Sequence, residues 1–130
     1  MNNAYHYEVD LVWTSERKGT ISSPVLNSSI EVATPPEFPK GIAGIWSPEH
    51  LFTAAVSSCL MTTFLSIAEN SKLNFTGFDC KSKGKLEQVD GKFLMTEIIL
   101  EPIVCLNPFV FELRAVWQKR NLIVYLFAHI

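Results

Sequence analysis

The sequence of 130 residues contains few charged residues and few cysteines. Both features exclude several classes of function. Eleven basic and thirteen acidic residues give a net charge near −2. No basic run exceeds the pairs Arg17–Lys18 and Lys119–Arg120, so the sequence lacks the charge pattern of a nucleic-acid-binding protein. The cysteines Cys59, Cys80 and Cys105 are odd in number and widely spaced, which predicts neither a disulfide framework nor a zinc site. We therefore expect no metal, no cofactor and no nucleic-acid partner.

A secretory signal is also missing from the sequence. Met1 is followed by NNAYHYEVD, which has neither a basic start nor an apolar run, so we expect a cytoplasmic protein with reduced thiols. The uncharged run Leu51–Ala68 has 18 residues and reaches the lower edge of a membrane span. Six of these residues are Ser or Thr, and Pro48–Glu49 and Glu69–Asn70 close the run. These features favour a helix of a soluble protein, and we expect no membrane partner.

Hydrophobic residues make up 48% of the chain, which suits the core of one globular domain spanning residues 1–130. Alternating large and polar residues over Tyr5–Thr14 and a β-branched run over Lys92–Val104 predict two strands. The stretch SERKG predicts a hairpin turn in which Gly19 takes a positive φ. After it, GTISSPVL predicts the returning strand and SIEVAT a third, short strand.

The most clearly specified element is a helix from Pro48 to about Asn70. Ser47 is a favourable N-cap, Pro48 suits the first helical position, and Glu49 complements the helix dipole. After this helix, FTGFDCKSKGKLEQVDGKFLMTEIIL predicts a second hairpin with its turn at Asp90–Gly91. The order of three strands, a long central helix and a second hairpin indicates an α+β fold.

Two stripes of side chains divide the surface of this helix. The first is bulky and should pack on a sheet; it consists of Phe52, Val56, Leu60, Phe64 and Ile67. The second has only small side chains and should let a second helix approach closely; it consists of Ala55, Ser58, Cys59, Thr62 and Ser66. Spacing alone favours Cys59 as a small hydrophobic side chain, since free cysteine is among the most buried residue types.

The stretch SPEHLFTAAVSSCLMTTFLSIA resembles the central-helix motif of the OsmC/Ohr family of thiol peroxidases. In that motif, Ser/Asn-Pro-Glu-x-Leu leads through a run of alanines to a peroxide-reactive cysteine. The resemblance extends from about Tyr7 to Val104 and implies an OsmC-like fold and an intertwined homodimer. It also implies a catalytic site of Cys59, Arg17 and Glu49, in which the arginine holds the thiolate and the glutamate holds the arginine.

The reaction that the resemblance implies is the reduction of organic hydroperoxides through a cysteine sulfenic acid. Electrons would come from a dithiol such as a dihydrolipoyl group. Trp46, Phe38 and Phe52 are candidates for the substrate pocket, and each of these apolar side chains suits the core equally well. The alternative function is a non-catalytic protein of the same fold that binds a small apolar ligand, or a degenerate relative without activity.

The C-terminal part departs from the family. The family's resolving cysteine lies on a second long helix, whereas this sequence ends in ELRAVWQKRNLIVYLFAHI, without a cysteine after Cys105. We expect a truncated second helix, a divergent tail over residues 106–130 and impaired turnover, with neither Cys80 nor Cys105 as a substitute. Reading WQKRNLIVYL from the third base of each codon permits an Ala-Glu-x-x-x-Asn-Cys-Leu string. This favours a frameshift near Leu106–Trp117 that displaces a cysteine from near position 124; if the frame is as printed, we expect a truncated relative of the family.

Overall fold

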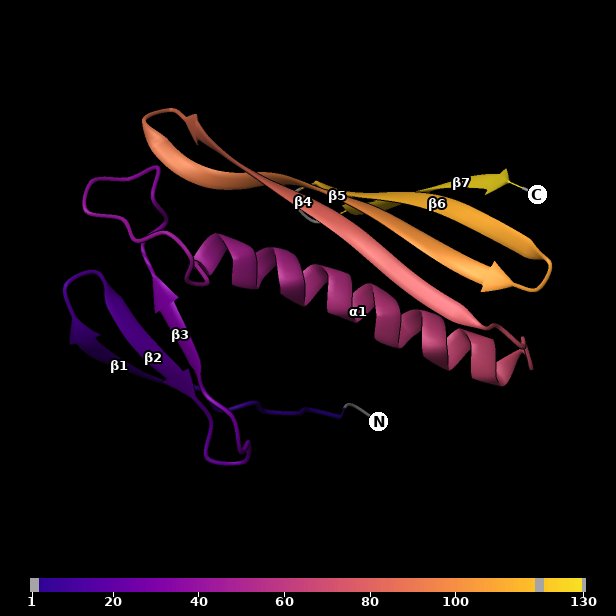
Figure 1. The fold of residues 1–130 in the computed structure, drawn as a ribbon, viewed down its shortest axis with the longest axis horizontal. Coiled ribbons are helices and arrows are strands. Elements are labelled where there is room, and N and C mark those ends of the chain that lie inside the picture. Colours follow the sequence, from indigo (N-terminus) through magenta and orange to yellow (C-terminus); the bar gives the residue numbers. More distant parts are fainter. Residues whose placement is uncertain (1–2, 119–120, 130) are drawn as a thin grey trace. The chain divides into compact units, whose positions relative to one another are not determined.

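The computed structural model describes residues 3–118 and 121–129 (Figure 1). The elements, in chain order, are β1 (Asp10–Ser15), β2 (Lys18–Ser22), β3 (Ile30–Ala33), α1 (Pro48–Asn70), β4 (Gly77–Val89), β5 (Lys92–Leu106), β6 (Phe109–Gln118) and β7 (Asn121–His129). They belong to two compact units, Met1–Pro48 and Glu49–Ile130. The first unit contains β1 to β3, and the second contains α1 from its second residue onward together with β4 to β7. The prediction of a single domain stays a prediction.

The first unit is an antiparallel sheet in the order β1-β2-β3, and its first hairpin is present as predicted. The turn of this hairpin consists of Glu16 and Arg17, and Glu16 has a left-handed φ of 49°. The prediction of Gly19 as the turn residue was wrong, because Gly19 lies inside β2 opposite Trp13. A glycine suits this position, since a Cβ atom on it would lie 2.6 Å from the carbonyl oxygen of Val12.

One face of this first sheet is apolar. The strand register aligns two rows of opposed residues, Leu11 with Ile21 and Ile30, and Trp13 with Gly19 and Val32. Directly opposed residues project to the same face of a sheet, so the two rows form one continuous surface. Leu11 and Trp13 are 68% and 72% exposed, so much of this apolar surface is open to solvent.

The first strand begins later than its sequence pattern predicts. Large and polar residues alternate from Tyr5 onward, but β1 begins only at Asp10. The reason is the length of its partner, since β2 ends at Ser22, which lies opposite Asp10. The segment Tyr5–Val9 therefore has a strand-like sequence and no strand partner among the described residues. The third strand, predicted from SIEVAT, is confirmed as Ile30–Ala33.

The central helix and the second hairpin are confirmed. Helix α1 spans Pro48–Asn70, as the N-cap and the uncharged run predict. Strands β4 and β5 are joined at Asp90 and Gly91, whose positive φ values of 51° and 78° are typical of a tight hairpin turn. The sheet of the second unit is antiparallel in the order β4-β5-β6-β7.

The core of the second unit lies between α1 and this sheet. Ile98, Leu100 and Ala115 have no exposed surface, and Val56 and Leu60 of α1 pack against them. Burial of such aliphatic side chains is the main stabilising term for a helix on a sheet. The bulky stripe of α1 therefore faces the sheet at its centre, as predicted.

The far end of the bulky stripe differs from the prediction at one position. Phe64 stacks on Phe78 of β4 with 5.0 Å between the ring centroids. Ile67, however, is 61% exposed, and Ala68 is buried in its stead. Ala68 follows Phe64 by four residues and so lies closer to the same helix face than Ile67 does. The predicted contact of Ile67 with the sheet was therefore wrong.

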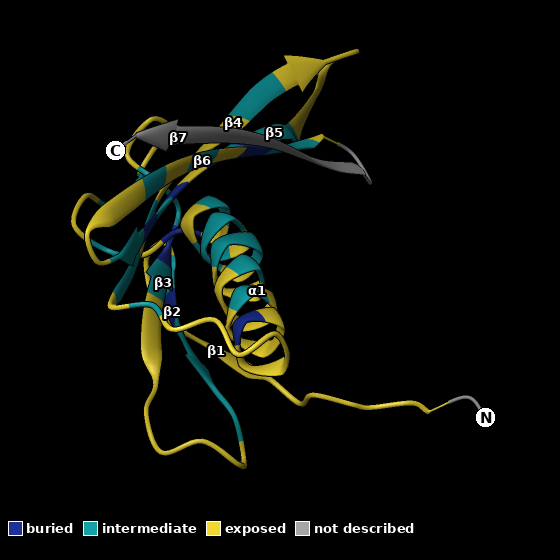
Figure 2. Cartoon of the chain, turned by 90° about the vertical axis from the view of Figure 1, so that its right-hand side faces the viewer, coloured by how far each residue is buried: buried dark blue, intermediate teal, exposed yellow. Residues whose placement is uncertain are grey.

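The small stripe of α1 is open to solvent. All five of its residues are exposed, and Figure 2 shows exposed positions running along the helix beside half-buried ones. Within residues 3–118 and 121–129, α1 is the only helix, so no second helix covers this stripe. By length and composition α1 could also cross a membrane, a test that core helices of soluble proteins pass as well.

The C-terminal part consists of strands, and the predicted truncated second helix was wrong. Strand β6 pairs with β5 on one side and with β7 on the other. The sequence FVFELRAVWQ explains this, since its aromatic and β-branched residues favour a strand and its Glu112 and Arg114 alternate with buried or half-buried neighbours. The frameshift prediction expects a displaced cysteine near position 124, which lies in β7, where the structure describes the strand pairing alone.

Candidate active site around Cys59

Cys59 lies near the middle of α1 and is exposed. It lines a cavity of about 380 Å³ between α1 and β6, together with Phe52, Ala55, Val56, Leu60, Thr63 and Trp117. The rings of Phe52 and Trp117 meet edge to face, with centroids 5.3 Å apart. A cavity of this size with an apolar lining is typical of small-molecule sites. The arrangement presents a thiol beside room for an apolar group.

Glu49 lies in the first turn of α1, as predicted. Its backbone carbonyl accepts a hydrogen bond of 2.8 Å from the Thr53 hydroxyl. Its carboxylate oxygen Oε2 is buried and has no hydrogen-bond partner among the described residues. A buried carboxylate oxygen that accepts no hydrogen bond destabilises the folded protein. A cation or an N–H group next to this oxygen would remove that penalty.

Arg17 lies in the turn between β1 and β2 and is exposed. Its carbonyl accepts a hydrogen bond of 3.1 Å from the Thr34 amide, which ties the turn to the loop after β3. The indole N–H of Trp13 donates to the carbonyl of Glu16 at 2.9 Å. The backbone on both sides of the Arg17 side chain is therefore anchored.

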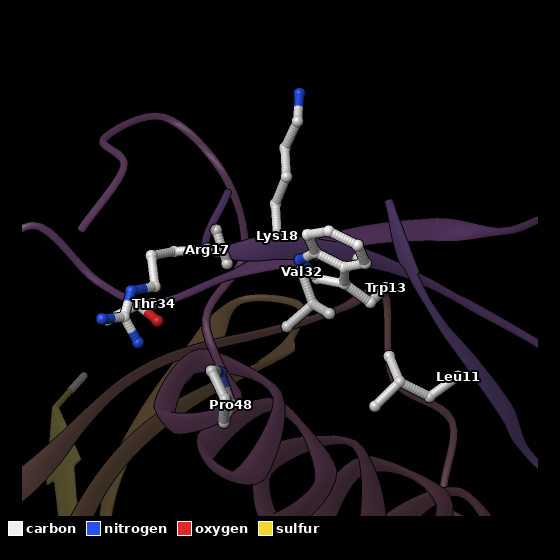
Figure 3. A pocket seen from close by; sticks show the side chains of 9 residues that line it. Leu11, Trp13, Arg17, Lys18, Val32, Thr34 and Pro48 are labelled. Atoms are coloured by element: carbon white, nitrogen blue, oxygen red, sulfur yellow. The ribbon is translucent and has the colours of Figure 1, made fainter. Parts of the chain in front are cut away.

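A shallow pocket of about 240 Å³ lies beside Arg17 within the first unit. Leu11, Trp13, Val32 and Pro48 supply most of its apolar lining, and Figure 3 shows Arg17 at one end and Leu11 at the other. The guanidinium of Arg17 forms no ion pair with any described residue. The turn thus presents a cation at the edge of an apolar surface.

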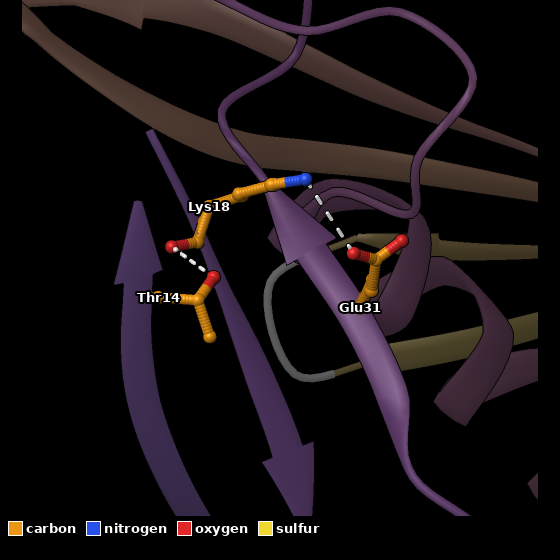
Figure 4. A network of polar contacts seen from close by, with 3 residues as sticks. All are labelled: Thr14, Lys18 and Glu31. Carbon is orange, nitrogen blue, oxygen red and sulfur yellow. Dashed lines mark hydrogen bonds and ion pairs between the residues drawn. The ribbon is translucent and has the colours of Figure 1, made fainter. Parts of the chain in front are cut away.

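Two polar contacts hold the strands that carry this turn. The Thr14 hydroxyl donates to the carbonyl of Lys18 at 3.2 Å, and the Lys18 ammonium lies 3.7 Å from the carboxylate of Glu31 (Figure 4). The first contact joins β1 to β2 and the second joins β2 to β3. Together they fix the strand ends next to Arg17.

Phe38 and Trp46, the other predicted pocket residues, lie in the connection between β3 and α1. The amide of Phe38 donates to the carbonyl of Pro35 at 3.1 Å, in a turn. The carbonyl of Trp46 accepts a hydrogen bond of 2.8 Å from the Ala33 amide, and the Trp46 side chain is 53% exposed. Both residues belong to the first unit, as Arg17 does.

Each unit therefore carries part of the predicted site. Cys59, Glu49 and Phe52 belong to the second unit, where Phe52 and Cys59 line the same cavity. Sequence reasoning missed Trp117, because it placed this residue in a divergent helical tail. The alternation of FVFELRAVWQ was the signal that could have identified it as an inward-facing strand residue. In the described part of the chain, no three His, Cys, Asp or Glu side chains form a group that could hold a metal.

Fold and site together define an α+β protein with an exposed thiol on its central helix, beside an apolar cavity. A family model described as OsmC-like protein matches residues 41–119, which is more than half of the chain. The chain belongs to the OsmC-like family. The match includes the helix with Glu49 and Cys59, and it extends through β6.

A solved structure supports the fold assignment. An OsmC-like protein of unknown function from Vibrio cholerae O1 biovar eltor matches with a TM-score of 0.70 and 25% sequence identity. The match covers 78% of this chain and 75% of that chain. No curated protein sequence matches this chain significantly. The predicted OsmC-like α+β fold is therefore confirmed, with strands in place of the second helix.

Proposed function

We propose that this protein reduces organic hydroperoxides through the thiolate of Cys59. The observation that carries the proposal is the position of Cys59 on the wall of an almost wholly apolar cavity of about 380 Å³. Such a cavity accepts the alkyl or aryl group of a hydroperoxide and leaves its O–O bond beside the sulfur. Hydrogen peroxide lacks an apolar group and gains nothing from this lining.

The chemical step transfers one oxygen atom to sulfur. The Cys59 thiolate attacks the terminal oxygen of ROOH, the O–O bond breaks, and the RO⁻ leaving group takes up a proton to become an alcohol. Sulfur is oxidised to the sulfenic acid Cys–S–OH, and the peroxide is reduced by two electrons. Because the thiolate is the nucleophile and a free thiol of pKa about 8.5 is mostly protonated at neutral pH, a nearby cation accelerates this step.

We propose Arg17 as the cation that stabilises the thiolate of Cys59 and Glu49 as the carboxylate that binds and orients the Arg17 guanidinium. Guanidinium and carboxylate form two parallel hydrogen bonds, which orient the arginine as well as attract it. The buried Oε2 atom of Glu49, which has no partner among the described residues, supports this role because it calls for a cation. The anchored backbone of the Arg17 turn supports it too, since a fixed turn limits where the guanidinium reaches.

Turnover requires an external dithiol and is proposed to be slow. One thiol of the reductant displaces the sulfenic oxygen as water and forms a mixed disulfide with Cys59, and the second thiol then releases Cys59. Residues 106–130 contain no cysteine, and this supports slow turnover because the family resemblance places a resolving thiol in that region. We propose a homodimer as the acting form, because the small stripe of α1 is exposed along its length.

A second candidate function is the binding of a small apolar ligand without catalysis. The same cavity favours it, because two aromatic rings and three aliphatic side chains outnumber its polar groups. Under this function the thiol of Cys59 is part of the lining and has no chemical role. The two functions make opposite predictions for the removal of the sulfur.

The experiment compares Cys59→Ser with the wild type and with Cys80→Ser and Cys105→Ser, which remove the other two cysteines. Each protein receives cumene hydroperoxide and a dithiol, and the loss of peroxide is measured. The proposal predicts consumption by the wild type and by both control variants, and none above background by Cys59→Ser. Equal rates for wild type and Cys59→Ser would refute it. Unchanged binding of cumyl alcohol in all four proteins, with no peroxide loss in any, would establish the second candidate.

A further inference from the structure

We propose that the hydroxyl of Thr63 is a catalytic group, which donates a hydrogen bond to the oxygen that leaves when Cys59 attacks a hydroperoxide. The proposal rests on the proposed function and deepens it, because it names the group that stabilises the leaving alkoxide. Breaking the O–O bond places negative charge on this oxygen, and a donor fixed beside it lowers the barrier.

Thr63 and Cys59 line the same cavity from the same helix. They are four residues apart, so their Cβ atoms lie about 5–6 Å from each other on one helix face. A reacting oxygen about 3–3.5 Å from the sulfur leaves the second peroxide oxygen on the far side of it. This second oxygen can then accept a hydrogen bond from the neighbouring hydroxyl at about 2.7–2.8 Å. The spacing therefore suits an O–O bond that lies between the two side chains.

The Thr63 hydroxyl is available to a ligand, whereas other hydroxyls of α1 are not. Serine and threonine in a helix commonly donate to the carbonyl three or four residues earlier. Ser57, Ser58 and Thr62 do so at 3.1 Å, and Thr53 does so at 2.8 Å. The Thr63 hydroxyl forms no hydrogen bond with any residue that the structure describes. It therefore keeps its proton for a partner in the cavity.

The rest of the cavity lining offers few donors to an oxygen atom. Its aliphatic side chains and Phe52 carry none. Trp117 has an indole N–H, but it lies on another element, and its ring is held edge to face against Phe52. Thr63 is also exposed, so solvent water can return the proton that it gives. Because the surroundings are apolar, one hydrogen bond to the developing charge is stronger there than in water.

The step balances with this donor in place. The thiolate of Cys59 forms an S–O bond with the terminal oxygen, and both electrons of the O–O bond pass to the RO⁻ group. The transferred oxygen keeps its hydrogen, so sulfur becomes the sulfenic acid Cys–S–OH. A proton passes from water through the Thr63 hydroxyl to RO⁻, which leaves as the alcohol ROH.

The experiment compares leaving groups of different basicity. Cumene hydroperoxide releases a strongly basic alkoxide, whereas perbenzoic acid releases benzoate, a weak base that needs little assistance. Thr63→Val and Thr63→Ala remove the hydroxyl, and Thr63→Ser keeps it. Ser57→Ala is the control, since it removes a hydroxyl of the same helix that is bonded to the Ala54 carbonyl and lies outside the cavity lining. Stopped-flow measurement gives the rate of a single oxidation of Cys59, and alkylation by iodoacetamide reports on the thiol itself.

Thr63→Val and Thr63→Ala should react with cumene hydroperoxide about tenfold more slowly than the wild type, or slower still. Their rates with perbenzoic acid and with iodoacetamide should stay within about twofold, and Thr63→Ser and Ser57→Ala should stay close to the wild type with every reagent. Wild-type rates with cumene hydroperoxide in both hydroxyl-free variants would overturn the proposal. Equal losses with both oxidants would also overturn it, because the hydroxyl would then act on the thiol and not on the leaving oxygen.

The failure of this proposal and that of the proposed function are distinguishable. If neither oxidant reacts with Cys59 in the wild type, the proposed function fails, and the role of Thr63 fails with it. If Cys59 is oxidised equally fast with and without the Thr63 hydroxyl, the peroxidase function stands and the role of Thr63 alone is refuted.

Discussion

The two compact units differ in how far the apolar face of their sheet is covered. In the second unit α1 covers the sheet, and Ile98, Leu100 and Ala115 are fully buried. In the first unit the apolar face carries Leu11 and Trp13 at 68% and 72% exposure. Apolar side chains stabilise a sheet through the hydrophobic effect only on a face that is covered. The second unit therefore holds its own core, whereas the first unit has apolar surface to offer to another molecule.

The largest effect expected from this comparison concerns equivalent truncations in the two units. Leu100→Ala removes a fully buried side chain and should lower the free energy of unfolding by about 2–5 kcal/mol. Leu11→Ala removes an exposed one and should change it by less than about 0.5 kcal/mol at concentrations where the protein is monomeric. Urea denaturation measures both. Similar losses for the two variants would show that the face with Leu11 is covered within the chain.

A second prediction tests how closely α1 lies on its sheet. A Cβ atom at Gly84 would collide with the Thr53 hydroxyl, so Gly84→Ala should destabilise the protein by about 1–3 kcal/mol. In a Thr53→Ala background the loss should be smaller. Gly77→Ala is the control, since its Cβ would meet Cys105 at an ordinary 3.6 Å. Thermal unfolding compares the variants, and equal losses at positions 84 and 77 would contradict the close approach.

A third prediction concerns the cavity wall formed by Trp117. Trp117→Ala removes the edge-to-face contact with Phe52, which is worth about 0.5–1.5 kcal/mol beyond its area, and opens the cavity. The rate at which Cys59 reacts with benzylmaleimide should fall several-fold, while its rate with small, polar iodoacetamide should stay unchanged. Trp117→Phe keeps an aromatic ring, so its rate with benzylmaleimide should lie between those of the wild type and Trp117→Ala. If the rates with both reagents fall equally, Trp117 affects the reactivity of the thiol itself and does not bind the apolar group of the reagent.

The smallest effects are expected for two surface ion pairs, one taken from each unit. Lys18 and Glu31 lie 3.7 Å apart, and Lys85 and Glu87 lie 3.3 Å apart. Both pairs are solvent-accessible, and such pairs contribute little because water screens them and the side chains lose entropy. Glu31→Gln and Glu87→Gln should leave the melting temperature nearly unchanged. A clear loss in one unit alone would indicate that its charges are held in a wider network.

Sequence patterns predicted those elements whose bounds are set by local capping and turn preferences. The helix from Pro48 to Asn70 follows from local capping and an uncharged run, and the turn at Asp90–Gly91 from local backbone preference. The beginning of β1 could not be predicted, because it depends on where β2 stops. Strand β6 was missed for a different reason, because the alternation in FVFELRAVWQ indicates a strand but the family resemblance led us to expect a helix there.

For the candidate site, the motif predicts the residues, and the structure shows what surrounds them. Phe52 was predicted as a pocket residue and does line the cavity of Cys59, but Trp117 was missed. The roles of Arg17 and Glu49 stay predictions, as does the frameshift within 106–117. Resequencing the gene from codon 100 onward tests the frameshift, which predicts that one base restores a cysteine near position 124.

We propose that Cys59 is the peroxide-reactive thiol and that neither Cys80 nor Cys105 acts as its partner thiol. This proposal is tested most directly by treating the full chain with one equivalent of cumene hydroperoxide and a sulfenic-acid trap, followed by peptide mass mapping. We expect one trapped adduct per chain, on Cys59, with Cys80 and Cys105 left as thiols. An adduct spread over all three cysteines, or a disulfide between Cys59 and either of the others, would contradict it.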